Sequence, residues 1–314
     1  GTKEIYQNNP ALNQVIHFDF LKEGLFKSLK FVLSLRKKYD ATINVYPSNR
    51  KEYNIINFLL GAKQRVGVKY LRMNFPELGW LNNVTVLEND KTHNVQTNIK
   101  LIEKLLNRHF DEEPALQIFL SDNDNMFAEK YLKENKIAAD DFVVGFHPGC
   151  ATLKNHIKRR WEPEKFAELG KRLIKDKSAK IFLFGGPEEE ELKESISKII
   201  DSEKSFIIKT EKFLQSIAIM KRCNVFVTND SALMHIASAL GLKVVAIIGP
   251  TNEYYIHPWK TEYKIASLYL DCSPCFFYSP KPLTCSRTDV KFKCIKELSV
   301  DMVLNKVNEF INEN

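Results

Sequence analysis

The second half of this 314-residue chain alternates apolar segments with amphipathic ones, and this alternation restricts the fold more than any other feature of the sequence. The apolar segments end in turns and read "FVVGFHPG", "AKIFLFGGP", "SFIIK", "NVFVTND" and "KVVAIIGPT". Helical periodicity lies between them, as in "EPEKFAELGKRLIKD" and "SALMHIASAL". Apolar strands separated by helices are typical of a parallel sheet covered on both faces. We therefore expect an α/β fold with a doubly wound sheet in this half.

The first half is less regular, and a short linker, "AADD" at 138–141, separates it from the second. Its apolar periodicity predicts helices over 24–40, 91–110 and 125–137, strands over 41–46 and 65–68, and a helix that stops at Gly61. We expect two domains, 1–138 and 139–314, the first of them also an α/β domain. The last helix, 299–313, has Ser299 as its expected N-cap.

The charge balance is only modestly basic, with 46 Lys and Arg against 39 Asp and Glu and a formal net charge of +7. The basic residues are spread through amphipathic helices and no nucleic-acid motif is present, so we expect no nucleic-acid partner. The excess suits a phosphorylated ligand or an anionic membrane face. The sequence has no apolar run of eighteen residues and no signal peptide at its start, so we expect a cytoplasmic protein, with peripheral contact to the inner face of the membrane.

Ligands of doubly wound sheets bind at the carboxyl ends of the strands, and "TNDSALMH" lies at such an end. The amides of Ser231, Ala232 and Leu233 begin a helix and are suited to bind a phosphate. Asp230 would repel phosphate, so it is better suited to accept hydrogen bonds from sugar hydroxyls. The alternative is purely structural, with Asp230 as an N-cap and His235 as a core histidine.

Two further strand ends carry residues that are candidates for binding a ligand. After "IFLFGGP", Gly186 allows close approach of a ligand and Glu189 is a candidate for ribose hydroxyls. The alternative for Glu189 is that four consecutive glutamates only complement the helix dipole. After "HPGC", the candidates for pairing with a diphosphate are Thr152, Lys158 and Arg159.

The order of these motifs, "FHPG", "KRRW", "IFLFGGPEEEE", "TNDSALMHIASALGLKVVAIIGPTNE" and "CSPC", resembles glycosyltransferase family 9, the heptosyltransferases of lipopolysaccharide core assembly. The resemblance implies a GT-B architecture, in which two Rossmann-like domains face a cleft. It implies an inverting, metal-independent transfer, without a cofactor, of a heptose or related sugar. The donor would be ADP-heptose or another nucleotide sugar in the second domain, and a lipopolysaccharide core acceptor would bind the first.

The resemblance also implies roles for individual residues of the donor site. Thr152 and either Lys158 or Arg159 match the phosphate contacts of the family, and Glu189 matches its ribose contact. The residues that match its sugar and phosphate loop are Asp230, Ser231 and Ala232, with His235 just behind.

The sequence departs from the family in three respects. Ala232 replaces a usual glycine, and "IKRRWEP" leaves the identity of the phosphate cation open between two residues. The chain starts at Gly1 without methionine, in a segment that resembles the part of the family after its first strand, Gly-Asp loop and first helix, so we expect a trimmed chain. Asp19 and Asp40 are not in a Gly-Asp loop, so we assign no general base. A non-catalytic nucleotide-sugar-binding member of the family is therefore the alternative.

Four late cysteines, Cys272, Cys275, Cys285 and Cys294, follow a C-x2-C-x9-C-x8-C spacing. One C-x-x-C is half of a zinc site, but the second pair is too widely spaced for a zinc ribbon. We expect "CSPC" to shape the donor-side loop. A zinc-stabilised interaction module remains a second alternative.

The pair Asp122 and Asp124 forms a D-x-D sequence, which binds metal in another glycosyltransferase architecture. Here it precedes a helix and has no second ligand cluster beside it. We therefore expect Asp124 to be a helix cap and expect no metal site.

Overall fold

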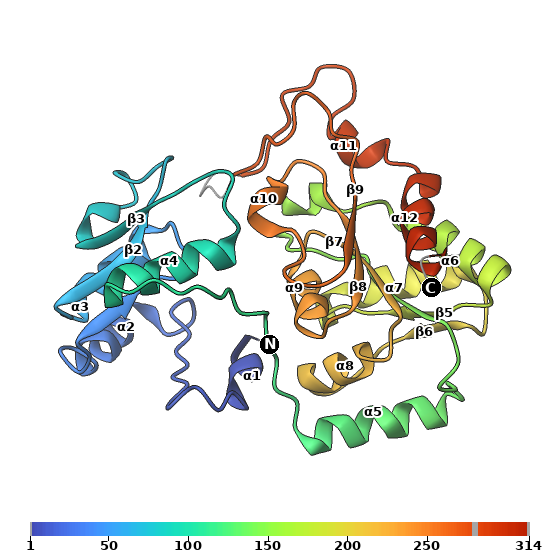
Figure 1. The fold of residues 1–314 in the computed structure, drawn as a ribbon, viewed down its shortest axis with the longest axis horizontal. Coiled ribbons are helices and arrows are strands. Elements are labelled where there is room, and N and C mark those ends of the chain that lie inside the picture. Colours follow the sequence, from blue (N-terminus) through green and yellow to red (C-terminus); the bar gives the residue numbers. More distant parts are fainter. Residues whose placement is uncertain (1, 278–281, 313–314) are drawn as a thin grey trace.

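The computed structural model describes residues 2–277 and 282–312. It contains two sheets, each made of parallel strands, which lie side by side (Figure 1). The smaller sheet has the order β1-β2-β3 and the larger one the order β6-β5-β4-β7-β8-β9. The strands are β1 (Ala41–Ile43), β2 (Gln64–Lys69), β3 (Val84–Leu87), β4 (Val143–His147), β5 (Lys180–Leu183), β6 (Ser205–Ile207), β7 (Val225–Asn229), β8 (Lys243–Ile247) and β9 (Tyr263–Ala266).

The helices connect these strands and cover the sheets. They are α1 (Thr2–Gln7), α2 (Gly24–Ser34), α3 (Lys51–Leu59), α4 (Asn94–Leu106), α5 (Asp122–Glu134), α6 (Pro163–Lys177), α7 (Glu190–Ile200), α8 (Phe213–Met220), α9 (Ala232–Ala239), α10 (Glu253–Ile256), α11 (Lys293–Lys296) and α12 (Val300–Asn312). The short 3₁₀ helices are η1 (Gly79–Leu81), η2 (Leu153–Arg159) and η3 (Pro187–Glu189). Among the described residues, none of these helices has both the length and the apolar character needed to cross a membrane.

The larger sheet is covered on both faces, as its apolar strands predict. One face packs against α6, α7 and α12 around Trp161 and Phe166, both fully buried. The other face packs against α5, α8 and α9 around Phe182 and Phe226 (Figure 1). The doubly wound prediction for this half is confirmed.

The predicted elements of the first half are present with changed bounds: α2, β1 and α4 are shorter than expected, β2 is longer, and α5 begins and ends three residues earlier. The helix expected over 24–40 ends at Ser34, because Lys37 adopts a φ of 57° and its amide donates to the carbonyl of Leu60 at 2.7 Å. The strands β3 and β9 were not predicted. The expected stop at Gly61 is confirmed, since its φ of 69° lies in the left-handed region that favours glycine.

The division between domains at residue 138 stays a prediction. The helix α5 precedes that point, yet it packs against α8, and Ala128 belongs to the core of the larger sheet. Two partly buried side chains before α5, Ile118 and Leu120, pack against the same core. We propose that a division before Ile118 describes the packing better.

The two caps proposed from the sequence are present. Ser299 accepts a hydrogen bond from the amide of Met302 at 3.2 Å, so it caps α12. At α5, Ser121 is the N-cap and the Asp124 carboxylate accepts from its amide at 3.0 Å, which completes a capping box. Asp124 therefore has the structural role expected for it.

Candidate functional site

The candidate site lies where the strand order of the larger sheet reverses. The chain crosses from β4 outward to β5 and β6, and then returns to place β7 on the other side of β4. The turns after β4 and β7 therefore leave in opposite directions, which opens a crevice at the carboxyl ends of these strands. The segments "HPGC" and "NDS" of the sequence lie at this crevice.

Asp230 follows β7 directly and is a buried carboxylate held by two donors. Its Oδ2 accepts from Nη1 of Arg159 and, at 2.7 Å, from the hydroxyl of Thr251. The alternative that Asp230 is the N-cap of the following helix is wrong, because Ser231 occupies the N-cap position of α9. Asp230 is instead the centre of a polar cluster that joins the ends of β7 and β8.

The amino end of α9 leaves backbone donors open, as predicted. Ser231 is extended there, with φ of −156° and ψ of 169°, and its side chain makes no capping bond. Within residues 2–277 and 282–312, no acceptor meets the amides of Ala232 and Leu233. Ala232 is exposed, so these amides and the helix dipole are available to an anion.

A second buried cluster lies beside the first and connects β4 to η3. Nε2 of His147 is 3.1 Å from Oε2 of Glu189, and Nδ1 of His147 is 2.8 Å from the hydroxyl of Ser231. Oε1 of Glu189 accepts from Arg160 at 3.1 Å. Burial alone would raise the pKa of Glu189, but the hydrogen bond and charge of His147, with the amide of Gly186 and the charge of Arg160, lower it overall.

Gly149 is required above Glu189, because a Cβ at this position would lie 1.6 Å from Oε1 of the carboxylate. The glycine thus lets the "HPGC" turn pass over a buried acid. Glu189 points inward with all the hydrogen bonds just described, so it differs from Glu188 of η3 and Glu191 of α7, which are exposed. The suggestion that these glutamates only complement the helix dipole is wrong for Glu189.

The segment before Trp161 supplies the cations of the site. Arg159 is buried on Asp230 and its guanidinium lies 5.7 Å from the ring centre of Phe276, whereas Lys158 is exposed. Nε of Arg159 and Nε2 of His156 are buried without a partner among the described residues. Burial, followed by the charge of Arg159, lowers the pKa of His156. The structure therefore brings Arg159, and not Lys158, into the polar cluster.

The remaining predicted residues lie around this cluster. Gly186 donates its amide to Glu189 at 3.1 Å. Thr152 is exposed at the start of η2 and makes no hydrogen bond within the described chain, so its proposed phosphate contact stays a prediction. His235 is half-buried one turn inside α9, and burial, followed by the charge of His257, lowers its pKa against the opposing effect of Asp230.

The first domain meets the second beside this site. Asn252, next to Thr251, donates to the carbonyl of Asp90 at 2.7 Å, and the hydroxyl of Tyr255 bonds to the Asp90 carboxylate. His93, the N-cap of α4, lies 3.0 Å from the carbonyl of His257. Thr251 of the Asp230 cluster therefore directly precedes Asn252, the residue that contacts the first domain at the junction between the two sheets.

Two hollows differ in their relation to this site. One, of about 1220 Å³, runs along α2 and α3 of the first domain and is reached by Lys154 of η2 from the second domain. It is lined mainly by apolar side chains that include Phe18, Leu25, Leu29, Val32 and Ile56.

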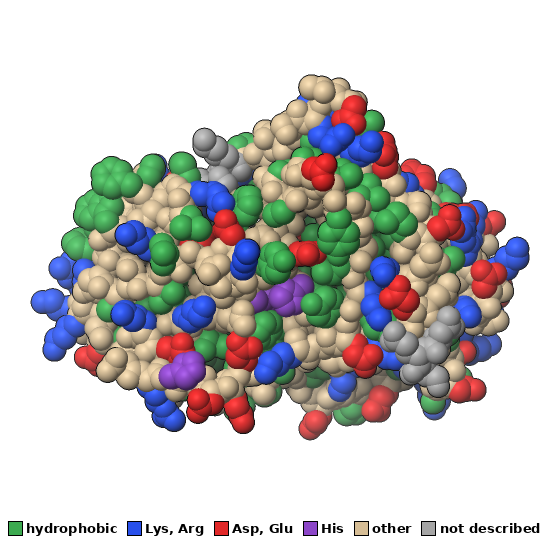
Figure 2. Space-filling view, turned by 45° about the horizontal axis from the view of Figure 1, so that its top comes forward, with side chains coloured by type: hydrophobic (Ala, Val, Ile, Leu, Met, Phe, Trp, Pro, Cys, Tyr) green, Lys and Arg blue, Asp and Glu red, His purple; other side chains and the backbone are tan. Residues whose placement is uncertain are grey.

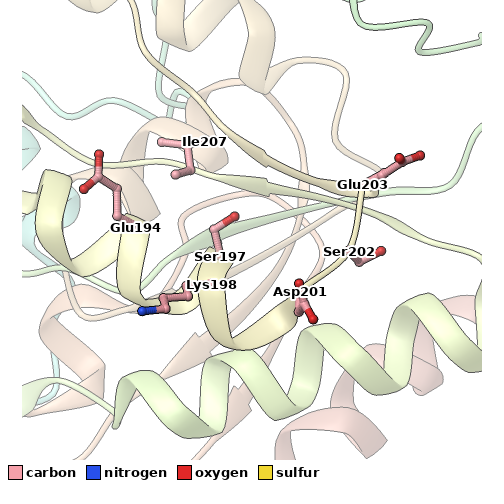
Figure 3. Close-up of a pocket in the computed structure, with 7 residues that line it drawn as sticks. All are labelled: Glu194, Ser197, Lys198, Asp201, Ser202, Glu203 and Ile207. Carbon is pink, nitrogen blue, oxygen red and sulfur yellow. The ribbon is translucent and has the colours of Figure 1, made fainter.

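The other hollow is a shallow depression of about 480 Å³ beside the last turns of α7 (Figure 3). It lies by the loop that enters β6, at the opposite edge from the candidate site.

Sequence reasoning missed three members of the cluster. His147 and Thr251 belong to "FHPG" and "GPT", segments that were recognised, and Arg160 follows the two residues between which the sequence left the phosphate cation open. A usable signal was present, because His147 is a polar residue at the end of a strand that is otherwise apolar. The path of η2 decides which of the three basic residues at 158–160 points inward. Lys154 and Asn155 in this segment have φ of 57° and 63°.

The late cysteines lie beside the turn that follows β8. The amides of Cys275 and Phe276 donate to the carbonyl of Pro250 at 3.0 and 2.9 Å, and Phe276 forms a bridge with Thr251. The "CSPC" segment thus contacts the turn that supplies Thr251, and its role in shaping a donor-side loop stays a prediction. In the described part of the chain, no group of three or more His, Cys, Asp or Glu side chains is arranged to hold a metal ion.

Known proteins share both the sequence and the architecture. The sequence model of glycosyltransferase family 9 (heptosyltransferase) matches residues 28–283. Lipooligosaccharide heptosyltransferase 2 of Campylobacter jejuni is 31% identical over 175 residues, which cover 53% of this chain and 51% of the relative. Its counterpart in Haemophilus influenzae is 29% identical over 237 residues, with 72% and 64% covered. The chain thus spans about half to two thirds of the curated relatives it matches.

The structure of an ADP-heptose lipopolysaccharide heptosyltransferase II from Escherichia coli superimposes with a TM-score of 0.67. It is 21% identical and the superposition covers 92% of this chain and 81% of that one. This likeness establishes the GT-B fold, two Rossmann-like domains that face a cleft.

Proposed function

Since this chain belongs to glycosyltransferase family 9, whose sequence model matches residues 28–283, we propose that it is a sugar transferase of lipopolysaccharide core assembly. It moves a heptose or related sugar from a nucleotide sugar, ADP-heptose in the first instance, to a core acceptor. The transfer is inverting and needs no metal ion. The name of the E. coli neighbour, an ADP-heptose heptosyltransferase, supports this choice of donor.

One observation carries the proposal. A buried carboxylate, Asp230, is fastened by Arg159 and Thr251 directly before a helix whose first amides, at Ala232 and Leu233, are open. This arrangement sets a hydrogen-bond acceptor for sugar hydroxyls beside donors for a diphosphate. A nucleotide sugar presents these two groups next to each other.

The chemistry of the step follows from this placement. The acceptor hydroxyl attacks the anomeric carbon of the sugar and releases its proton to water, while the bond from that carbon to the diphosphate breaks and its electron pair leaves with the diphosphate, on which the charge develops. The α9 amides and Arg159 stabilise that charge where a metal ion would otherwise do so. Glu189 would reach ribose hydroxyls only after it exchanges its hydrogen bond from Arg160, so its ribose role remains a proposal.

On the acceptor side, two features suit a lipid-linked substrate. The hollow along α2 and α3 is apolar and opens toward Lys154 of the donor domain. Leu25, at the rim of this hollow, and the following Phe26 are 83% and 89% exposed on α2, and Lys27 and Lys30 lie on the same helix. Exposed apolar side chains next to lysines favour contact with an anionic membrane surface. We propose that the protein works at the inner face of the cytoplasmic membrane, with α2 toward the lipid.

Calorimetry with ADP and ADP-heptose, followed by a transfer assay in the presence of EDTA, tests the proposal. We expect both ligands to bind and the transfer to persist when metal ions are removed. Asp230→Asn keeps the shape of the side chain and loses its charge. This variant should still bind ADP, lose the additional affinity for the sugar, and transfer about 10²–10³ times more slowly.

Asp122→Asn is a matched control, because it makes the same chemical change at an exposed position at the start of α5. Its transfer rate should equal that of the unmodified chain. Binding of ADP-heptose without any transfer would favour the non-catalytic member of the family. Failure of both ligands to bind would contradict the proposed donor.

A further inference from the structure

Two side-chain nitrogens beside Asp230 are buried without a hydrogen-bond partner in the described part of the chain. They are Nε of Arg159 and Nε2 of His156, which belong to residues three positions apart on η2. Arg159 is only 8% exposed, so bulk water does not supply the missing acceptor. A buried donor that nothing satisfies destabilises a fold, and each such group in a native structure needs an explanation. A ligand that brings the acceptor is one explanation.

The contact between these two side chains determines which nitrogen of the imidazole carries the hydrogen. Nη2 of Arg159 is 3.4 Å from Nδ1 of His156. A guanidinium group only donates, so Nδ1 is the acceptor and carries no hydrogen. Burial, followed by the charge of Arg159, lowers the pKa of His156, which supports a neutral ring. The single ring hydrogen then lies on Nε2, and this nitrogen is a donor.

The fold holds His156 in place before any ligand binds. Its carbonyl oxygen accepts from the thiol of Cys150 at 3.2 Å. The carbonyl of Lys154, two residues earlier, accepts from the amide of Leu283 at 2.9 Å. The ring of Phe276 packs steeply against the imidazole, with 5.1 Å between the ring centres and 75° between the planes. A donor that is already fixed loses little conformational freedom when it binds a ligand.

The charges at this place show why an additional neutral donor strengthens the binding of an anion. Arg159 is paired with the carboxylate of Asp230, so these two side chains together carry no net charge. A diphosphate at the start of α9 therefore meets the open amides of Ala232 and Leu233 beside a neutral pair. A hydrogen bond to a charged acceptor is stronger than one between neutral groups, so one more donor adds affinity.

We infer that His156 is a binding residue for the donor diphosphate and donates from Nε2 to a phosphate oxygen; this inference rests on the proposed function. The ring of Phe276 covers the place, since its centre also lies 5.7 Å from the guanidinium carbon of Arg159. The amide of Phe276 donates to the carbonyl of Pro250 at 2.9 Å, so the ring turns aside while the backbone stays. An aromatic face is a weak acceptor, and a phosphate oxygen is a stronger one.

Two substitutions separate the two nitrogens of the ring. The side-chain amide of glutamine reaches about as far from the backbone as Nε2 of histidine, whereas that of asparagine reaches only as far as Nδ1. His156→Gln therefore keeps a donor for the phosphate, and His156→Asn does not. Both variants lose the ring that packs against Phe276, so a general loosening of η2 affects both.

The first measurement is calorimetry of the full chain with inorganic pyrophosphate, a diphosphate without sugar or base. We expect His156→Asn to bind pyrophosphate about tenfold more weakly than the unmodified chain, and His156→Gln to keep most of the affinity. Equal losses in the two variants, or no loss in either, would overturn the inference. Failure of the unmodified chain to bind pyrophosphate would overturn it as well.

The same measurement with ADP distinguishes this inference from the proposed function. If the proposed donor is right, the affinities of the three proteins for ADP should follow the same order as those for pyrophosphate. An affinity for ADP that is unchanged in His156→Asn would contradict the contact with the diphosphate. A chain that binds pyrophosphate but not ADP would contradict the proposed donor and leave the role of His156 in place.

The position of the ring hydrogen is measured on the chain labelled with ¹⁵N-histidine, without any ligand. Long-range ¹H–¹⁵N spectra at about pH 7.5 should show the hydrogen of His156 on Nε2, and His156→Gln identifies the signal. Pyrophosphate should then shift this signal more than those of exposed histidines. A hydrogen on Nδ1 of His156 would overturn the inference.

Discussion

The two sheets of this chain are stabilised by different kinds of interior. The six-stranded sheet buries aromatic and aliphatic side chains on both faces, with Phe182 and Phe226 among the fully buried ones. The three-stranded sheet has a small apolar core around Val66, Val68 and Leu101. Much of its remaining interior is polar.

Asparagine side chains form that polar interior. Asn82 donates to Asn54 at 2.8 Å and accepts from Asn57 at 2.7 Å, and Asn54 also accepts from Asn44 at 3.0 Å. Gly67 of β2 leaves the space, because a Cβ there would lie 2.7 Å from the Asn82 amide. Large apolar side chains of this region remain outside instead, and Figure 2 shows hydrophobic side chains gathered at the end of the molecule that carries β1–β3.

This difference teaches why one half of the fold was easier to predict than the other. Hydrophobic periodicity detects an interior made of apolar side chains, but it does not detect an interior made of amide side chains. A network of satisfied amides also defines one arrangement and tolerates few changes. The following predictions test whether the two interiors respond as this comparison requires.

The largest expected effect is on the apolar interior. Phe226→Ala removes a fully buried ring from the centre of the six-stranded sheet, so we expect it to lower the free energy of unfolding by about 3–5 kcal/mol. Urea denaturation followed by tryptophan fluorescence and circular dichroism measures this loss. The same change at Phe26, which is 89% exposed on α2, should alter it by less than about 0.5 kcal/mol. Similar losses for the two variants would contradict the assignment of the cores.

The next effect concerns the polar interior. Asn82→Ala removes the acceptor of the buried Asn57 amide and one of the donors to Asn54, and we expect a loss of about 1–3 kcal/mol in the free energy of unfolding. Asn83→Ala is the matched control, since Asn83 is exposed and water can replace its hydrogen bonds. If Asn82→Ala proved as mild as Asn83→Ala, the polar network would not stabilise the smaller sheet.

The junction between the two sheets should be sensitive to acid. Burial, followed by the charge of His257, lowers the pKa of His93 to about 3. The unfolded chain, with a pKa of about 6.5, then binds a proton that the folded chain does not. This contribution to stability is complete above about pH 6.5 and is lost as the pH falls toward 3, by about 1.4 kcal/mol per pH unit.

Replacement of His93 by asparagine isolates this contribution. Asparagine can cap α4 as His93 does, but it cannot titrate. Urea midpoints between about pH 6.5 and 5 should therefore fall less steeply for His93→Asn than for the unmodified chain. Parallel pH profiles would show that His93 is not buried neutral at the junction.

The smallest effect is expected at the exposed edge of the junction. Arg72 forms two hydrogen bonds with Asp90, at 2.9 and 2.8 Å, and its guanidinium lies 3.9 Å from the ring centre of Phe277. Because both charged side chains are partly exposed, Arg72→Met should cost less than about 1 kcal/mol. A loss greater than that of Asn82→Ala would place the main link between the sheets here.

The sequence by itself determined the class of the larger sheet and the neighbourhood of the site. Five apolar strands alternating with helices allow few arrangements other than a parallel sheet, and the polar residues after "FVVGFHPG" and "NVFVTND" must then meet at its carboxyl edge. Asp230, Ser231 and Glu189 were found in this way. Periodicity and turn residues act locally, and so they can be read along the chain.

Only the tertiary structure decided which side chains in that neighbourhood face one another. It brought Arg159 to Asp230 while Lys158 stayed exposed, and it placed His147 between Glu189 and Ser231. These choices depend on the path of η2, on the glycine that lets a turn pass over Glu189, and on the packing of β4 against β7. A contact between residues 42 and 84 positions apart is a property of packed elements, and no local pattern in the sequence encodes it.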